Sequence, residues 1–69
     1  MKTISGKEFA SILEKHGWIL KRIQGSHHIY SKEGKVERIS IPIHGSSNLK
    51  IGLLKHLLKI SGLDEKDLN

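Results

Sequence analysis

The sequence predicts an α+β fold in which two helices pack on one face of a three-stranded antiparallel sheet, in the order α-β-β-β-α. Apolar side chains recur at helical spacing near both ends of the chain. Between them lie three runs rich in strand-forming residues, separated by turns that contain glycine. Because 69 residues can bury only one small core, we expect a single domain over residues 1–69.

The first helix is predicted over residues 6–16 by signals at both of its ends. Ser5 and Glu8 have the spacing of a capping box, in which each side chain bonds the backbone amide of the other residue. One stripe follows at positions i, i+3, i+4 and i+7: Phe9, Ile12, Leu13 and His16. Gly17 ends the helix, because glycine adopts the left-handed conformation of a helix terminus without strain.

Three strands are predicted from the change to a period of two. The first runs from Trp18 to Ile23, and the second runs from His27 to Lys32 after a turn at residues 24–26. A glycine-bearing hairpin loop at residues 33–35 leads to the third strand, which we expect from Val36 to Ile43. Within the third strand, alternate isoleucines share one face, and Pro42 lacks an amide hydrogen, so this strand should be an edge there or be ending.

The second helix follows a loop at residues 45–48, and we expect Asn48 or Ser47 to cap it. Its apolar stripe consists of Ile51, Leu54, Leu57 and Leu58, widened by Leu53 and Ile60. Gly62 ends it. The acidic tail at residues 64–69 is expected to be a short terminal helix or a frayed end. A three-stranded meander with two helices on its apolar face resembles a double-stranded-RNA-binding domain.

Composition narrows the possible functions. The chain has no cysteine, which excludes disulfides and thiolate metal sites. No apolar run approaches the roughly 18 residues of a membrane span, and no signal-peptide core follows Met1, so we expect a cytoplasmic protein without a membrane partner. The formal net charge is +5, and a basic body attracts polyanions, of which nucleic acid is the usual one. The alternative is a solvated cationic surface that only keeps the protein soluble.

The five histidines are the candidate chemical groups. His16, in the last turn of the first helix, and His56, among lysines of the second, are expected to be structural or surface residues. His27 and His28 follow the predicted turn and should point to opposite faces of their strand. Diverging rings argue against a shared metal, and we expect no metal or small-molecule cofactor.

Other catalytic arrangements are not supported by spacing. Ser26 beside His27 does not make a triad, and the glutamates show no paired arrangement. What remains is acid–base chemistry by a histidine in a cationic setting, since imidazole exchanges protons near neutral pH. The alternative is a histidine that only hydrogen-bonds phosphate or stacks on a base.

An ordered set of motifs over residues 5–63 resembles the HicA toxins, small ribonucleases of type II toxin–antitoxin modules. The set consists of Gly17-Trp18, Arg22, Gly25-Ser26-His27-His28, Pro42-Ile43-His44-Gly45, Leu49-Lys50-Ile51-Gly52 and Leu54. The resemblance implies the same α-β-β-β-α fold, metal-independent cleavage of mRNA that arrests translation, and a HicB antitoxin that masks the active face. It also implies that His27, directly after Gly-Ser, is the residue needed for cleavage.

The expected RNA-binding residues are Lys21, Arg22, Gly25, Ser26, His28, His44, Lys50 and Lys55. The sequence departs from the family pattern at Ser47, where lysine is frequent, and at Leu53, where threonine is common. We expect these departures to affect RNA binding more than the cleavage reaction. The rival interpretations are a non-catalytic RNA-binding module with the same fold and a domain whose basic face meets an acidic protein partner.

Overall fold

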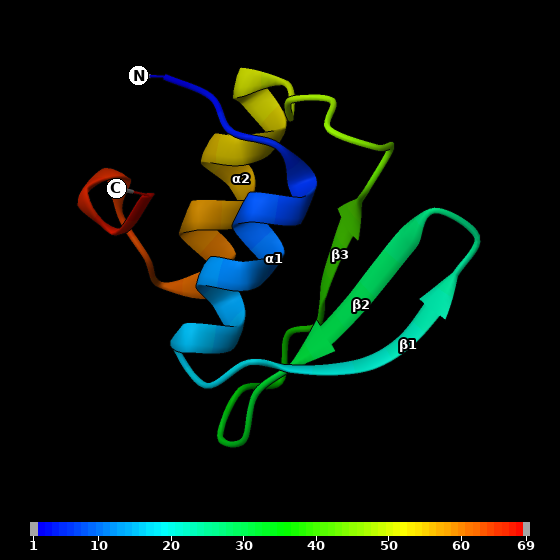
Figure 1. Cartoon of the computed structure of the whole chain (residues 1–69). Helices are drawn as coiled ribbons and strands as arrows, with labels where there is room; N and C mark the ends of the chain where they lie inside the picture. Colours follow the sequence, from blue (N-terminus) through cyan, green and yellow to red (C-terminus); the bar gives the residue numbers. More distant parts are fainter. Residues whose placement is uncertain (1, 69) are drawn as a thin grey trace.

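The computed structural model describes residues 2–68. It contains α1 (Gly6–Lys15), β1 (Ile19–Gln24), β2 (His27–Ser31), β3 (Ile39–Pro42), α2 (Ile51–Ser61) and a short 3₁₀ helix, η1 (Glu65–Leu68). The two long helices lie on one side of the sheet (Figure 1). The α-β-β-β-α order predicted from the sequence is therefore confirmed.

The sheet is an antiparallel meander with β2 in the centre, in the order β1-β2-β3. Its helix-covered face carries Tyr30 from β2 and the isoleucines of β3, Ile39 and Ile41, all of them buried. In β1 the register shifts between Leu20 and Arg22, which marks a β-bulge. β3 lies at the sheet edge and ends at Pro42, as expected for a residue that cannot donate to a ladder.

The core fills the space between the helices and the sheet. Its largest fully buried side chains are Tyr30, Phe9, Leu13, Ile39, Ile41 and Leu54. Gly6, the first residue of α1, permits the close approach of this helix to β3, because a Cβ on Gly6 would overlap the carbonyl oxygen of Pro42. The start of α1 is thereby held against the end of β3, at the same end of the molecule as the β1–β2 turn (Figure 1).

The signals at the ends of α1 and at the end of α2 are confirmed. The Glu8 amide donates to the Ser5 hydroxyl and the Ser5 amide donates to the Glu8 carboxylate, each over 3.1 Å, which completes the capping box. α1 ends at Lys15 with His16 as its C-cap, and Gly17 follows in a left-handed conformation. α2 ends at Ser61, and its C-cap, Gly62, is itself left-handed.

The expected cap of α2 is wrong. Neither Ser47 nor Asn48 caps the helix: Lys50 is the N-cap, and it makes no side-chain capping bond. The reason is a long-range contact that sequence spacing does not reveal. Asn48 forms a β-bridge with Ser5, and the Leu49 amide donates to the Ile4 carbonyl over 2.8 Å. These contacts hold the chain extended past Asn48, so the helix begins later.

The strands are also shorter or displaced relative to their predicted limits. β1 begins at Ile19, because Trp18 turns into the core, and extends to Gln24. β2 ends at Ser31, since Lys32 begins a turn in which the Lys35 amide donates to its carbonyl over 3.0 Å. β3 begins at Ile39 rather than Val36, whose side chain is 96% exposed.

The acidic tail forms η1 as far as Leu68, which is packed against the core, and Asn69 lies outside the described residues. The carboxylate of Asp67, in η1, lies 3.7 Å from Nε2 of His16. Nδ1 of His16 lies 2.9 Å from the Ile12 carbonyl oxygen, which agrees with the structural role expected for this histidine. No helix within residues 2–68 has the length and apolar character needed to cross a membrane.

Candidate active site and nucleic-acid interface

His27 is the first residue of β2 and directly follows the two-residue turn formed by Gly25 and Ser26. Gly25 has a φ of 61° and Ser26 has a negative φ, the pattern of a type II′ hairpin turn, which needs glycine at its first central position. This tight turn fixes the register of the hairpin and places His27 opposite Gln24 of β1. The side chain is exposed.

The outer face of the sheet carries His27, on the side away from the helices. Tyr30 is buried on the inner face, and side chains alternate along a strand, so His27 and Ile29 point outward. Arg22 is paired with Ile29 and therefore lies diagonally across from His27 on the same face. Diagonal neighbours of this kind are separated by about 7–8 Å between Cα atoms, within reach of an arginine side chain.

His28 points to the opposite face from His27, as the sequence predicts. It is half-buried and pairs with Ile41, which is fully buried, on the inner side of the sheet. The two imidazoles therefore diverge and do not share one phosphate or one metal ion. Among residues 2–68, no three histidine, aspartate or glutamate side chains are grouped so as to hold a metal ion.

Two cationic side chains lie on β1, the strand that pairs with β2 next to His27. Lys21 lies at the bulge and Arg22 on the outer face, and both are exposed. Within the described part of the chain neither cation is engaged by an ion pair. The imidazole of His27 likewise makes no hydrogen bond there. The charges of Lys21 and Arg22 are therefore available to a bound anion.

A hollow of about 270 Å³ lies at the end of β3, next to His27. Its walls are formed by Pro42, His44, Ser47, Asn48, Leu49, Lys50 and Leu53. Pro42 is the cross-strand partner of His27, so the hollow begins beside the histidine. Two of the predicted RNA-binding residues, His44 and Lys50, meet here, together with both positions that depart from the family pattern.

The first turn of α2 opens near this hollow without a side-chain cap. Uncapped amides at a helix N-terminus, with the positive end of the helix dipole, favour an anion. Lys55 is exposed on the second turn of α2, in the helical layer, and does not line the hollow. The structure thus places Arg22, Gly25 and Ser26 around His27, and His44 and Lys50 in the hollow next to its partner Pro42, while Lys21 lies at the bulge and His28 and Lys55 lie apart from the site.

Two neighbours of His27 were not predicted as site residues from the sequence. Gln24 was expected within the turn at residues 24–26, but it ends β1 and pairs with His27, because the turn has only two residues and such a turn pairs its flanking residues. Pro42 could not have been found, because its position depends on the long-range register between β2 and β3.

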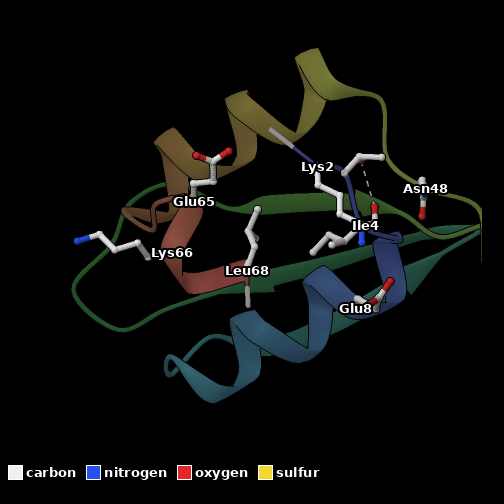
Figure 2. Close-up of a pocket in the computed structure, with 8 residues that line it drawn as sticks. Lys2, Ile4, Glu8, Asn48, Glu65, Lys66 and Leu68 are labelled. Carbon is white, nitrogen blue, oxygen red and sulfur yellow. Dashed lines mark hydrogen bonds between the residues drawn. The ribbon is translucent and has the colours of Figure 1, made fainter.

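A larger hollow, of about 670 Å³, lies elsewhere, among the N-terminal segment, the start of α1 and η1 (Figure 2). Its lining residues are Lys2, Thr3, Ile4, Glu8, Asn48, Glu65, Lys66 and Leu68. None of the predicted catalytic or RNA-binding residues is among them. It mixes both signs of charge, unlike the surface around His27.

The chain also matches a known protein family. The family described as HicA toxin of bacterial toxin-antitoxin matches residues 6–63. The chain belongs to the HicA toxin family. This HicA chain therefore has the role of a toxin, and its counterpart is an antitoxin. No curated protein matches it. The matched range runs from the start of α1 to just beyond Gly62, and so contains the sheet, both helices and the hollow beside Pro42.

Proposed function

We propose that this HicA toxin is an endoribonuclease that cleaves mRNA by histidine acid–base catalysis and thereby arrests translation. The observation that carries the proposal is the position of His27, exposed on the outer face of the sheet, with Arg22 diagonally opposite and Lys21 next to Arg22 in β1. An imidazole supplies proton transfer, and the cations stabilise charge that develops on a phosphate. The reaction uses no metal.

In the proposed reaction, His27 takes or gives a proton at the scissile phosphodiester. The nucleophile is the neighbouring 2′-hydroxyl, which attacks phosphorus and displaces the 5′ oxygen. DNA lacks this hydroxyl and is spared. A positioned histidine contributes about 10²–10⁴-fold to the rate, so we expect a modest nuclease, although each cut destroys a message.

The RNA follows a path from β1 to the start of α2. Lys21 and Arg22 attract the backbone on one side of His27, and the hollow beyond Pro42 offers Lys50 on the other. Gly25 and Ser26 form the turn at which the backbone approaches most closely. Because these contacts are electrostatic, binding should weaken as salt rises.

A HicB-type antitoxin is the partner that we propose for the same face. A protein that covers His27 and Arg22 would exclude RNA and neutralise the exposed cations. Its effect is measurable as loss of cleavage when the toxin is mixed with such an antitoxin before RNA is added. Cleavage that continues in a stable complex would show that the antitoxin covers a different surface.

The test of catalysis replaces His27 with alanine and incubates the pure protein with RNA, with and without EDTA. Because the side chain of His27 is exposed and makes no hydrogen bond within residues 2–68, His27→Ala should fold normally and bind RNA with nearly unchanged affinity. Cleavage should fall by at least about 10²-fold. His56→Ala, which removes an exposed imidazole from α2, is the matched control and should retain activity.

Three results would contradict the proposal. Undiminished cleavage by His27→Ala would show that the activity resides elsewhere. RNA binding by the wild-type chain without any cleavage would favour a non-catalytic RNA-binding module, because the same cations serve that function. Loss of activity in EDTA would show that a metal ion takes part.

A further inference from the structure

The pairing between β2 and β3 continues beyond the two strands by one backbone hydrogen bond. His27 is the partner of Pro42, and the Ile43 amide donates to the Ser26 carbonyl over 2.8 Å in the same register. This contact carries the chain alongside the β1–β2 turn, and His44 follows it by one residue, two positions beyond Pro42. His44 is thus the diagonal neighbour of His27, at a Cα separation of about 7–8 Å for an extended pair.

His44 is held at this position by its own backbone. Its carbonyl accepts a 3.0 Å hydrogen bond from the Ser47 amide, which closes a turn directly after it. The side chain is exposed and lines the hollow that also contains Pro42 and Lys50. Within residues 2–68 its ring makes no hydrogen bond, so both ring nitrogens are available to a ligand.

Cleavage by a 2′-hydroxyl needs two proton transfers at opposite sides of phosphorus. One removes the proton of the attacking hydroxyl, and the other delivers a proton to the departing 5′ oxygen. A single imidazole beside the attacking oxygen does not reach the leaving oxygen, because the two oxygens lie roughly in line through phosphorus. A second group is therefore expected on the far side of the bound phosphate.

The other histidines do not meet this requirement. His28 points to the inner face of the sheet beside Ile41. His16 caps α1, with one ring nitrogen at the Ile12 carbonyl and the other facing Asp67. His56 lies on α2, in the helical layer behind the sheet. Only His44 adjoins His27 across Pro42.

We propose that His44 is the general acid of the cleavage reaction and His27 its general base, an inference that rests on the proposed ribonuclease function. His27 accepts the 2′-hydroxyl proton as the O2′–P bond forms. The P–O5′ bond breaks, and the protonated imidazole of His44 gives its proton to O5′. The products are a 2′,3′-cyclic phosphate and a 5′-hydroxyl. Lys50 lines the same hollow as His44, and its charge would stabilise the phosphate oxygens in the transition state.

The test compares two RNA oligonucleotides of one sequence, one of them with sulfur in place of the bridging 5′ oxygen at the cleavage site. A thiolate departs without a proton, so this substrate needs a base but no acid. His44→Ala should cleave ordinary RNA about 10²–10⁴-fold more slowly than the wild type and cleave the sulfur substrate at nearly the wild-type rate. His27→Ala should be slow on both substrates. Lys50→Ala, which removes a neighbouring cation, should slow both equally.

Each other outcome is decisive. If His44→Ala is equally slow on both substrates, His44 binds or positions RNA and is not the acid. If it is as fast as the wild type on both, His44 has no part in the reaction. Wild-type protein that cleaves neither substrate contradicts the ribonuclease function itself, and the assignment of His44 fails with it. Far-UV circular dichroism of each variant checks the fold, which the exposed position of His44 leaves intact.

Discussion

The hydroxyl of Tyr30 donates a 2.6 Å hydrogen bond to the Glu14 carboxylate and so joins the centre of β2 to α1. Tyr30 is 1% exposed, and its pKa is raised well above 10, first by burial and then by the hydrogen bond and charge of Glu14. The bond lies on the inner side of the sheet, on the face away from His27. It fixes the strand that carries the histidine without occupying the reactive surface.

Alkaline titration of Tyr30 should show whether its hydrogen bond to Glu14 is present in solution. The folded pKa of Tyr30 exceeds the unfolded value of about 10, so the stability that it contributes is fully present below pH 10 and is lost as the pH rises through the folded pKa. Since Tyr30 is the sole tyrosine, near-ultraviolet absorbance of its phenolate follows a single group. We expect the phenolate to appear only together with unfolding.

Tyr30→Phe removes the hydroxyl and keeps the ring. Because a hydrogen bond to a charged group contributes about 1.5–3 kcal/mol, we expect a loss of that size in denaturant unfolding. The alkaline loss of stability should shrink, and RNA cleavage should be unchanged. Phenolate that forms near pH 10 while the protein stays folded would show that the bond to Glu14 is not kept in solution.

Gly6 should be intolerant of any side chain. Gly6→Ala places a methyl group against the Pro42 carbonyl, and we expect a loss of about 1–3 kcal/mol in the free energy of unfolding, because backbone at both partners must move. Gly52→Ala is the matched control: this glycine of α2 has open space around its Cβ position, and alanine should stabilise by about 0.5–1 kcal/mol. Equal effects from the two substitutions would contradict the steric account.

The capping box of α1 should make stability sensitive to acid. Hydrogen bonds from Ser5 lower the pKa of Glu8. The contribution of the Glu8 carboxylate to the stability of the fold is therefore fully present above the unfolded pKa of 4.5 and is lost as the pH falls through the lower folded pKa. Glu8→Gln retains a capping side chain but should remove this acid-dependent part. Ser5→Ala should cost about 1 kcal/mol at neutral pH. Thermal unfolding across acidic pH tests both, and an unchanged acid profile in Glu8→Gln would contradict the assignment.

Much of the fold could be predicted because its determinants are local. The capping box, the stripe of α1 and the glycines that end both helices each lie within a few residues of their effect. The predictions that failed concern features set by contacts between residues far apart in the sequence. Asn48 is taken from its expected capping role by a bridge to Ser5, more than forty positions away. β3 begins late because Val36 lies outside the ladder that pairs β3 with β2.

The same distinction applies to the candidate site. Alternation along β2 was enough to separate His27 from His28, and the structure confirms that separation. The presence of Arg22 on the face of His27 depends on the two-residue turn at Gly25 and Ser26, whereas the sequence predicts a turn over residues 24–26, which would give a different register. The approach of His44 to His27, by contrast, depends on the register of β3 and on the Ile43–Ser26 hydrogen bond. No pattern within either segment contains that information.

The cations of the outer face should set the salt dependence of RNA binding. Each phosphate contact to single-stranded RNA contributes a slope of about −0.7 in a plot of log affinity against log salt, because it releases condensed counterions. Arg22→Ala should therefore flatten the plot by about 0.7 and weaken binding most at low salt. Lys59→Ala removes the same charge from the last turn of α2, in the helical layer, and should leave the slope unchanged. Fluorescence anisotropy with a labelled, non-cleavable RNA, in which 2′-methoxy groups replace the hydroxyls, measures both slopes. Parallel plots for Arg22→Ala and the wild type would show that RNA does not cross the outer face beside His27.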